Sequence, residues 1–374
     1  MADRARPPHR AMTPLAEILA ARIAATGPIT VAEFMAECLL HPTHGYYTTR
    51  TPFGQAGDFT TAPEISQMFG ELLGLALAQA WHDQGAPPGA ILAEIGPGRG
   101  TLMADIRRVL KQVPGAATLR PHLVEASPAL RAEQATRVPE AVRLDRVEDL
   151  PDAPLLLVAN EFFDALPIRQ FERHAAGWAE RQIGLAEGAL AFGRAQPAAL
   201  ASLAHRMADT GPGDLVETCA PAQPIIAEIA GRIARHGGAA IIADYGDWRS
   251  KGDTLQAVRA HRPDPVLAHP GQADLTAHVD FEPLAQAART AGASVSAMIP
   301  QGVFLERLGI TTRAQALATG LEGAALQSHI AAHRRLTHPE EMGTLFKVLC
   351  VSPPSAPPVP GSIAPPNPGK PDAP

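Results

Sequence analysis

The chain has 374 residues, a length that suits one enlarged domain or two small ones. Its 32 basic and 38 acidic residues give a formal net charge of −6, without any run of Lys and Arg, so non-specific nucleic-acid binding is not predicted. No stretch of 18 successive apolar residues occurs, so no membrane span is predicted. The three cysteines are odd in number and far apart, which indicates reduced thiols. We expect a cytoplasmic bacterial protein, or a mitochondrial matrix protein if the source is eukaryotic.

The N-terminal part of the chain is predicted to be helical, with one long loop. Apolar spacing over residues 14–40 predicts two helices that Gly27-Pro28 separates. Residues 41–62 are polar and turn-rich, and a loop of this length is either functional or disordered. Another helix is expected from about Ser66 to Trp81. We interpret residues 1–85 as an extension to the rest of the chain, with a loop that covers the functional site.

The remainder of the chain alternates strand and helix patterns. Seven segments have a strand-like composition: 90–95, 119–125, 141–144, 155–159, 239–244, 294–299 and 344–351. The first five are joined by crossovers, which predicts an α/β fold with a doubly wound, mostly parallel seven-stranded sheet and helices on both faces. We place this core at residues 86–351, with insertions at about 169–213, 247–290 and 301–340 on the substrate side.

The C-terminal segment is unusually rich in proline. Residues 352–374 contain ten prolines and show no apolar periodicity. Such a composition is typical of a disordered or polyproline-like tail, so we expect these residues to lie outside the fold.

A glycine-rich loop follows the first predicted strand of the sheet. Residues 93–101 read Ala-Glu-Ile-Gly-Pro-Gly-Arg-Gly-Thr, and a helix pattern follows them. Glycines allow a tight turn that comes close to a ligand, and the helix offers unpaired N–H groups. The spacing is G-x-G-x-G, and Thr101 stands where a dinucleotide-binding loop would have its third glycine. The loop therefore predicts a nucleoside cofactor held by Glu94, Gly96, Pro97, Gly98, Gly100 and Thr101.

An acidic residue ends the second predicted strand. Glu125 follows Leu123-Val124, and a carboxylate at this place can accept hydrogen bonds from both hydroxyls of a ribose. After the third strand, Asp145 or Glu148 could reach the adenine amino group, although either could equally be an ordinary surface acid.

The fourth predicted strand runs into Asn160-Glu161-Phe162-Phe163-Asp164. Ligands bind at the carboxyl ends of central strands, so these residues are predicted to surround the reacting group. Two carboxylates beside two aromatic rings suit a planar guanidinium, which paired acids can hold and deprotonate. We therefore predict catalytic roles for Asn160, Glu161 and Asp164 and substrate contacts for the two phenylalanines. The alternative is a simple helix start, with Asn160 as its cap.

Several blocks, taken in order, resemble one family, the MidA-type methyltransferases that use S-adenosylmethionine and are related to a mitochondrial complex I assembly factor. The blocks lie at residues 45–47, 53–64, 94–102, 124–128, 160–167, 242–246, 253–255, 274–280 and 342–346.

This resemblance implies S-adenosylmethionine as the cofactor and a protein arginine as the acceptor, in a complex I subunit, with symmetric dimethylarginine as the product. It adds Asp58 and Thr61 as cofactor contacts. It adds Glu64, Tyr46, Tyr47 and His278 as substrate contacts.

Other readings remain open or are disfavoured. A non-catalytic assembly chaperone with this fold is the main alternative to the enzyme. A metal site at Cys38, His41 and His44 lacks a fourth ligand nearby, so no metal is predicted. The oligomeric state is left open, a homodimer included.

Overall fold

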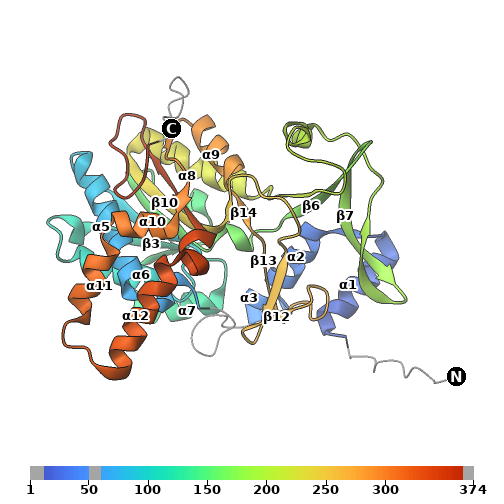
Figure 1. The fold of residues 1–374 in the computed structure, drawn as a ribbon, viewed down its shortest axis with the longest axis horizontal. Coiled ribbons are helices and arrows are strands. Elements are labelled where there is room, and N and C mark those ends of the chain that lie inside the picture. Colours follow the sequence, from blue (N-terminus) through green and yellow to red (C-terminus); the bar gives the residue numbers. More distant parts are fainter. Residues whose placement is uncertain (1–11, 50–59, 365–374) are drawn as a thin grey trace.

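The computed structural model describes residues 12–49 and 60–364, and two lobes are visible in Figure 1. The larger lobe contains a central sheet with the strand order β15-β17-β10-β5-β2-β3-β4. Its strands are β2 (Ile91–Ile95), β3 (Arg120–Val124), β4 (Val142–Leu144), β5 (Leu155–Asn160), β10 (Gly238–Asp247), β15 (Ser294–Val295) and β17 (Phe346–Ser352). Two short strands pair with it outside this order, β14 (Val279–Asp280) with β10 and β16 (Ile299–Pro300) with β17.

The five strands of this sheet that come first in the chain, β2, β3, β4, β5 and β10, are parallel to one another. Strand β17 runs antiparallel to β10. The predicted doubly wound, mostly parallel sheet is therefore confirmed. The single strand expected at 294–299 is instead split into β15 and β16, both paired with β17.

Helices cover both faces of the sheet. They are α5 (Gln67–Asp83), α6 (Thr101–Leu110), α7 (Pro128–Arg137), α8 (Ala222–His236), α9 (Phe281–Thr290), α10 (Gln301–Arg307), α11 (Ile310–Ala318) and α12 (Gly323–Thr337). Side chains of α5, α6 and α10 form one hydrophobic core with the sheet, and side chains of α8 and α9 form another. Every residue of β5 is buried, as expected for a strand covered on both faces.

The smaller lobe combines the N-terminal helices with two insertions. It contains α1 (Pro14–Thr26), α2 (Val31–Leu40) and α3 (Tyr46–Thr49). One sheet contains β1 (Ile29–Thr30), β6 (Arg169–His174), β7 (Gly177–Ala186), β8 (Ala189–Arg194) and β9 (Leu215–Thr218), and another contains β11 (Gln256–Arg259), β12 (Arg262–Asp264) and β13 (Asp274–Thr276). Segments far apart in sequence thus share a third core.

Short helical segments complete the chain: α4 (Ala62–Ile65), η1 (Ala116–Thr118), η2 (Val147–Asp149), η3 (Phe163–Ala165), η4 (Ala201–Met207) and η5 (Pro339–Gly343). Two helices that the sequence analysis placed outside the predicted core in fact belong to the larger lobe. Helix α5, grouped with residues 1–85, packs against the central sheet, because most of its side chains are buried. Helix α9, grouped with an insertion, belongs to the main core.

The prediction that the chain leaves the fold after residue 351 needs correction. Residues 352–364 return to the larger lobe, where Val359 is buried and Ile363 pairs with Ala297. Arg307 also donates hydrogen bonds to the carbonyls of Gly361 and Ser362. Proline composition failed as an indicator because a single apolar side chain and backbone carbonyls suffice to anchor such a segment.

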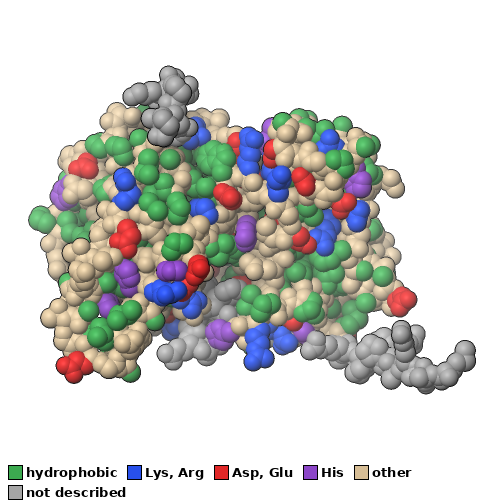
Figure 2. Space-filling view, in the orientation of Figure 1, with side chains coloured by type: hydrophobic (Ala, Val, Ile, Leu, Met, Phe, Trp, Pro, Cys, Tyr) green, Lys and Arg blue, Asp and Glu red, His purple; other side chains and the backbone are tan. Residues whose placement is uncertain are grey.

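The surface in Figure 2 carries acidic and basic side chains interspersed over both lobes. Within the described part of the chain, no helix has both the length and the apolar character needed to cross a membrane.

Candidate active site

The glycine loop adopts the backbone that its sequence predicts. Gly96, Gly98 and Gly100 all have positive φ values, of 63°, 51° and 80°. A side chain at Gly96 would also collide with Phe162, since its Cβ would lie 2.7 Å from Cδ2 of that ring. The loop after β2 is therefore fixed by backbone conformation and by contact with the turn after β5.

A cavity opens between this loop and the turn after β5. It is lined by Thr61, Pro63, Glu64, Glu94, Gly96, Pro97, Gly98, Arg99, Thr101, Leu102, Asn160 and Glu161. Five of the six predicted cofactor residues of the glycine loop, all except Gly100, thus share one cavity with Asn160 and Glu161, two of the predicted catalytic residues.

Two acceptor atoms beside this cavity have no hydrogen-bond partner among the described residues, namely Glu94 Oε2 and Asn160 Oδ1. Burial raises the pKa of Glu94 well above its usual range, and the nearby charge of Glu125 adds to the shift. A buried acceptor without a donor is costly, so these atoms suit a ligand that brings N–H groups or positive charge.

Glu125 lies where the sequence predicted it, at the end of β3. Its Oε1 accepts a hydrogen bond from the backbone N–H of Ser127 at 2.8 Å. Burial raises the pKa of Glu125, while this N–H and the charge of Arg131 oppose the shift. Gln134 of α7 donates to the carbonyl of Gly98 at 2.7 Å and so ties the glycine loop to α7. Gln134 was not foreseen.

Glu64 contacts the glycine-loop side of the site. Its Oε1 accepts a hydrogen bond from Thr101 Oγ1 at 2.5 Å, at the first residue of α6. Nitrogen atoms of Arg99 and Arg137 lie 3.8 Å from its two oxygens. The sequence analysis assigned Glu64 to substrate, and these contacts place its carboxylate beside Thr101 and Arg99 of the glycine loop.

The turn after β5 is held from two sides. Glu161 has a left-handed backbone, with φ of 51°, and its Oε1 accepts hydrogen bonds from Ala62 N and from Asn160 Nδ2, both at 2.9 Å. Burial raises its pKa, while these donors and the charge of Arg335 oppose the shift. Since a left-handed conformation is strained for a glutamate, the surrounding contacts must impose it.

Asp244, in the C-terminal half of β10, also holds this turn. Its Oδ2 accepts hydrogen bonds from the backbone N–H groups of Phe162, Phe163 and Asp164 at 3.1, 2.9 and 3.3 Å. Burial and the charge of Glu161 raise the pKa of Asp244 to about 8, while the N–H donors favour its charged form. The sequence analysis assigned no role to Asp244, although an acid at the carboxyl end of a buried strand was the signal used for Glu161.

Asp164 is buried in a group of acids. Its side chain is 6% exposed, and its Oδ1 has no partner among the described residues. Burial raises its pKa well above the usual range, and the charges of Asp244, Glu161 and Asp274 add to this. Asp274, on β13 of the smaller lobe, was also missed by the sequence analysis.

Tyr47 and His278 reach this region from the smaller lobe. Tyr47 donates a hydrogen bond to Asp274 Oδ1 at 2.9 Å. The ring of His278 packs edge-on against Tyr245, with centroids 5.2 Å apart, and burial lowers the pKa of His278.

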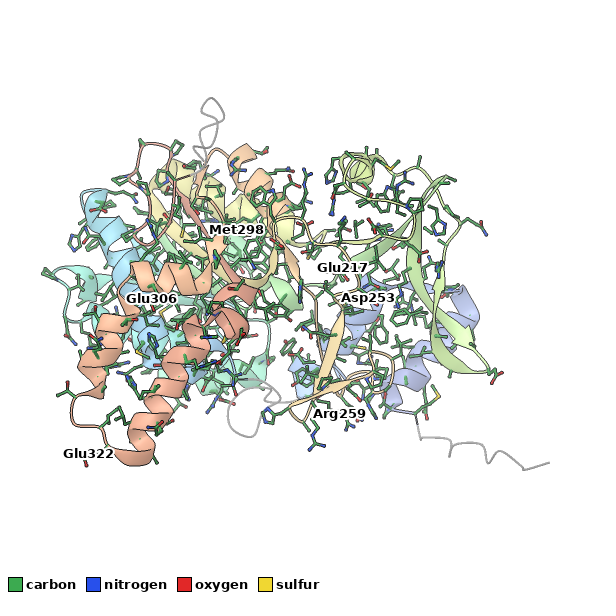
Figure 3. The ribbon with its side chains drawn as sticks, in the orientation of Figure 1. Glu217, Asp253, Arg259, Met298, Glu306 and Glu322 are labelled. Carbon is green, nitrogen blue, oxygen red and sulfur yellow. The ribbon has the colours of Figure 1, made fainter. Side chains whose placement is uncertain are left out.

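A polar network fixes the backbone of His278. Glu217 and Asp253, labelled in Figure 3, both accept from Gln170 Nε2, at 2.7 and 2.8 Å. Thr254 donates its hydroxyl to Glu217 and accepts the backbone N–H of His278 at 2.8 Å. The insertions therefore position the smaller lobe's side of the site.

Other predicted residues lie elsewhere. Tyr46 and Phe163 are 0% and 3% exposed and belong to hydrophobic cores, so neither ring faces a substrate in this structure. Asp145 is an exposed side chain paired with Arg131. Asp58 lies outside the described residues. Over residues 12–49 and 60–364, no group of three or more His, Cys, Asp and Glu side chains could hold a metal ion.

A doubly wound sheet with a glycine loop after β2, an acid after β3 and carboxylates after β5 defines the class I methyltransferase fold. Residues 72–299 match the family described as "Putative S-adenosyl-L-methionine-dependent methyltransferase". The chain belongs to this family. The unpaired Glu94 Oε2 and the Gly96 cradle fit its cofactor, because the methionine part of S-adenosylmethionine carries an ammonium group and needs close backbone approach.

Similar proteins include one from mouse named protein arginine methyltransferase NDUFAF7, mitochondrial, which is 39% identical over 91% of this chain and 85% of its own length. A Drosophila melanogaster homolog of that name is 36% identical with the same coverage. A crystal structure from Burkholderia thailandensis bound to S-adenosyl-homocysteine superposes with a TM-score of 0.80 at 30% identity, covering 93% of this chain and 94% of the other.

Proposed function

We propose that this methyltransferase transfers a methyl group to an arginine of a protein, and that Glu161 holds and deprotonates the acceptor nitrogen. One observation carries the proposal: the Glu161 carboxylate lines the same cavity as the glycine loop. The names of the relatives, protein arginine methyltransferase, support the same acceptor.

Different residues would bind the cofactor and the acceptor arginine. Glu94 and Glu125, with the glycine loop, would hold S-adenosylmethionine, which supplies an electrophilic methyl group when bound. Glu161, fixed by Ala62 and Asn160, orients a guanidinium nitrogen toward that methyl group. The nitrogen loses its proton after methylation, and the raised pKa of Glu161 makes its carboxylate an effective acceptor near neutral pH.

A subunit of respiratory complex I is the proposed target, and symmetric dimethylarginine the proposed product. Both extend the resemblance to complex I assembly factors. The proposed compartment is the cytoplasm of a bacterium, or the mitochondrial matrix in a eukaryote; the names of the relatives support this only as far as the word mitochondrial.

Radiolabelled methyl transfer into lysate proteins tests this function. Wild type should label a protein band whose hydrolysate contains methylarginine. The Glu161→Gln variant should incorporate at least 100-fold less label while still binding S-adenosylhomocysteine. Label in another amino acid would contradict the arginine assignment. Cofactor binding without any label would favour the assembly chaperone.

A further inference from the structure

Helix α4 contacts both the glycine-loop side of the site and the turn after β5. At its first residue, the backbone N–H of Ala62 donates a hydrogen bond to Glu161 Oε1 at 2.9 Å. Two residues later, the carboxylate of Glu64 accepts a hydrogen bond from the Thr101 hydroxyl at 2.5 Å. Glu64 and Glu161 also line the same cavity. One short helix therefore joins the start of α6 to the proposed proton acceptor.

Glu64 is the polar attachment of α4. The other residues of this helix are all apolar: Ala62, Pro63 and Ile65. Nitrogen atoms of Arg99 and Arg137 lie 3.8 Å from the two carboxylate oxygens of Glu64, whose side chain is 18% exposed. Apolar packing is non-directional, whereas a hydrogen bond from a hydroxyl to a carboxylate has a preferred geometry. Glu64 is thus suited to fix the orientation of α4 on the glycine loop.

The N–H at the start of α4 acts directly on Glu161. Burial raises the pKa of Glu161, and the hydrogen bond from the Ala62 N–H is the largest of the effects that oppose this shift. Other polar and charged groups act on Glu161 from neighbouring elements, namely Asn160 of β5, Asp164 of η3, Asp244 of β10 and Arg335 of α12, a helix that packs against α4. The placement of α4 therefore influences how readily Glu161 takes up a proton.

We propose that Glu64 is a positioning residue for Glu161: by fixing α4 on the glycine loop, it keeps the N–H of Ala62 on the Glu161 carboxylate. This inference rests on the proposed function, in which Glu161 receives a proton from the acceptor nitrogen. It gives Glu64 a role in proton transfer although its own carboxylate bonds the opposite side of the cavity.

Replacing Glu64 by Ala should release α4 from Thr101 and the two arginines. The Ala62 N–H then no longer favours the charged form of Glu161, so the pKa of Glu161 should rise. A merely structural role for Glu64 would lower the stability of the fold without moving the titration of Glu161. The titration of this one carboxyl group therefore separates the two roles.

Carbon NMR of the full chain, isotopically labelled at the glutamate carboxyl carbons, measures that titration. The Glu161 signal is the one that is missing from Glu161→Gln. Its midpoint should rise by about one pH unit in Glu64→Ala, and by about half a unit in Glu64→Gln, which keeps an acceptor for Thr101 but loses the charge. Glu140→Gln is the matched control, because Glu140 pairs with Arg107 of α6 and does not line the cavity, and it should leave the midpoint unchanged.

Methyl transfer into lysate proteins at saturating S-adenosylmethionine supplies a second test. Glu64→Ala should lower the label about tenfold in the wild-type background but less than about twofold in the Glu161→Gln background, because a positioning residue matters only while the acid that it positions is present. An equal loss in both backgrounds would overturn the proposal.

The proposal is also overturned if Glu161 titrates identically in wild type and in a Glu64→Ala variant that melts as a folded protein. Should Glu64→Ala fail to fold, the nearly isosteric Glu64→Gln decides the question. The NMR titration needs no turnover, so its outcome is independent of the proposed function. Methylarginine formed by wild type beside an unchanged Glu161 titration would contradict the role of Glu64 alone.

Discussion

The Oδ2 atom of Asp244 accepts a hydrogen bond from the backbone N–H of Phe163 at 2.9 Å. This contact joins the carboxyl end of β10 to the turn after β5, because Asn160 and Ala243 are paired in the sheet. The neighbouring N–H groups converge on the same oxygen, so one buried carboxylate shapes the turn that presents Glu161 and Asp164.

Replacing Asp244 by Ala should therefore damage both stability and catalysis. The backbone N–H groups of Phe162, Phe163, Asp164 and Tyr245 would all lose this acceptor, at a cost of roughly 1–3 kcal/mol for each group left unsatisfied. Asp244→Asn keeps one acceptor oxygen and should be milder. We expect the Ala variant to lose more than tenfold in turnover in a methyl-transfer assay, with denaturant unfolding reporting stability. Wild-type turnover in the Ala variant would show that the turn holds its shape without Asp244.

Glu94→Gln should separate stability from cofactor binding. The buried Oε2 of Glu94 has no partner among the described residues, and burial raises the pKa of this acid. A neutral amide removes the cost of a buried charge, so the ligand-free variant should melt at a higher temperature than wild type. It should also bind S-adenosylhomocysteine about 10–100-fold more weakly, since a charge-assisted hydrogen bond contributes about 1.5–3 kcal/mol.

Thermal melting and calorimetry measure both quantities for Glu94→Gln on the same sample. Glu140→Gln is a suitable control, because Glu140 is exposed and does not line the cavity. Unchanged affinity in Glu94→Gln would remove this acid from the cofactor site.

The sequence was sufficient for the central sheet and the cofactor loop because both depend on short-range signals. Buried strands such as β5 are continuous apolar runs, and the glycines of the loop need backbone conformations that other residues avoid. These signals lie within a few residues, so periodicity and spacing reveal them.

The side of the site that the smaller lobe forms, near Asp164, could not be predicted in the same way. Asp274 meets Asp164 only because β13 joins α2 and α3 in a lobe assembled from three distant segments. Tyr46 and Tyr47 are neighbours in sequence, yet Tyr46 is fully buried in that core, whereas Tyr47 packs at its margin and donates a hydrogen bond to Asp274. Such differences depend on long-range packing, which a single sequence does not encode in any local pattern.

The anchored C-terminal segment should contribute measurable stability. Truncation after Ser352 removes Val359, whose burial is worth about 1.5–3 kcal/mol, together with the hydrogen bonds from Arg307. We expect a lower midpoint in urea unfolding for this truncation. Truncation after Ala364 keeps all of these contacts and serves as the control. Equal midpoints for the two truncated chains would show that the segment adds nothing to stability.

Asp280 should make the stability of the protein depend on pH. Burial raises its pKa from 3.8 to about 7, and the charge of Glu282 adds to the shift while Arg206 and Arg249 oppose it. Its Oδ1 has no partner among the described residues, and Arg206 lies 3.5 Å from Oδ2. Between pH 4 and 7 the folded state thus keeps a proton that the unfolded state has released.

The contribution of Asp280 to stability is therefore full below pH 4, falls as the pH rises toward 7, and changes no further above that. The slope is at most about 1.4 kcal/mol per pH unit. Asp280→Asn imitates the protonated carboxyl group, so its stability relative to wild type should increase between pH 4.5 and 7. Urea unfolding at four pH values in this range measures the difference. Asp214→Asn is the control: hydrogen bonding to Gly211 lowers the pKa of Asp214, so it is ionised in both states throughout the range. A constant difference between Asp280→Asn and wild type across these pH values would mean that Asp280 is already ionised in the folded protein.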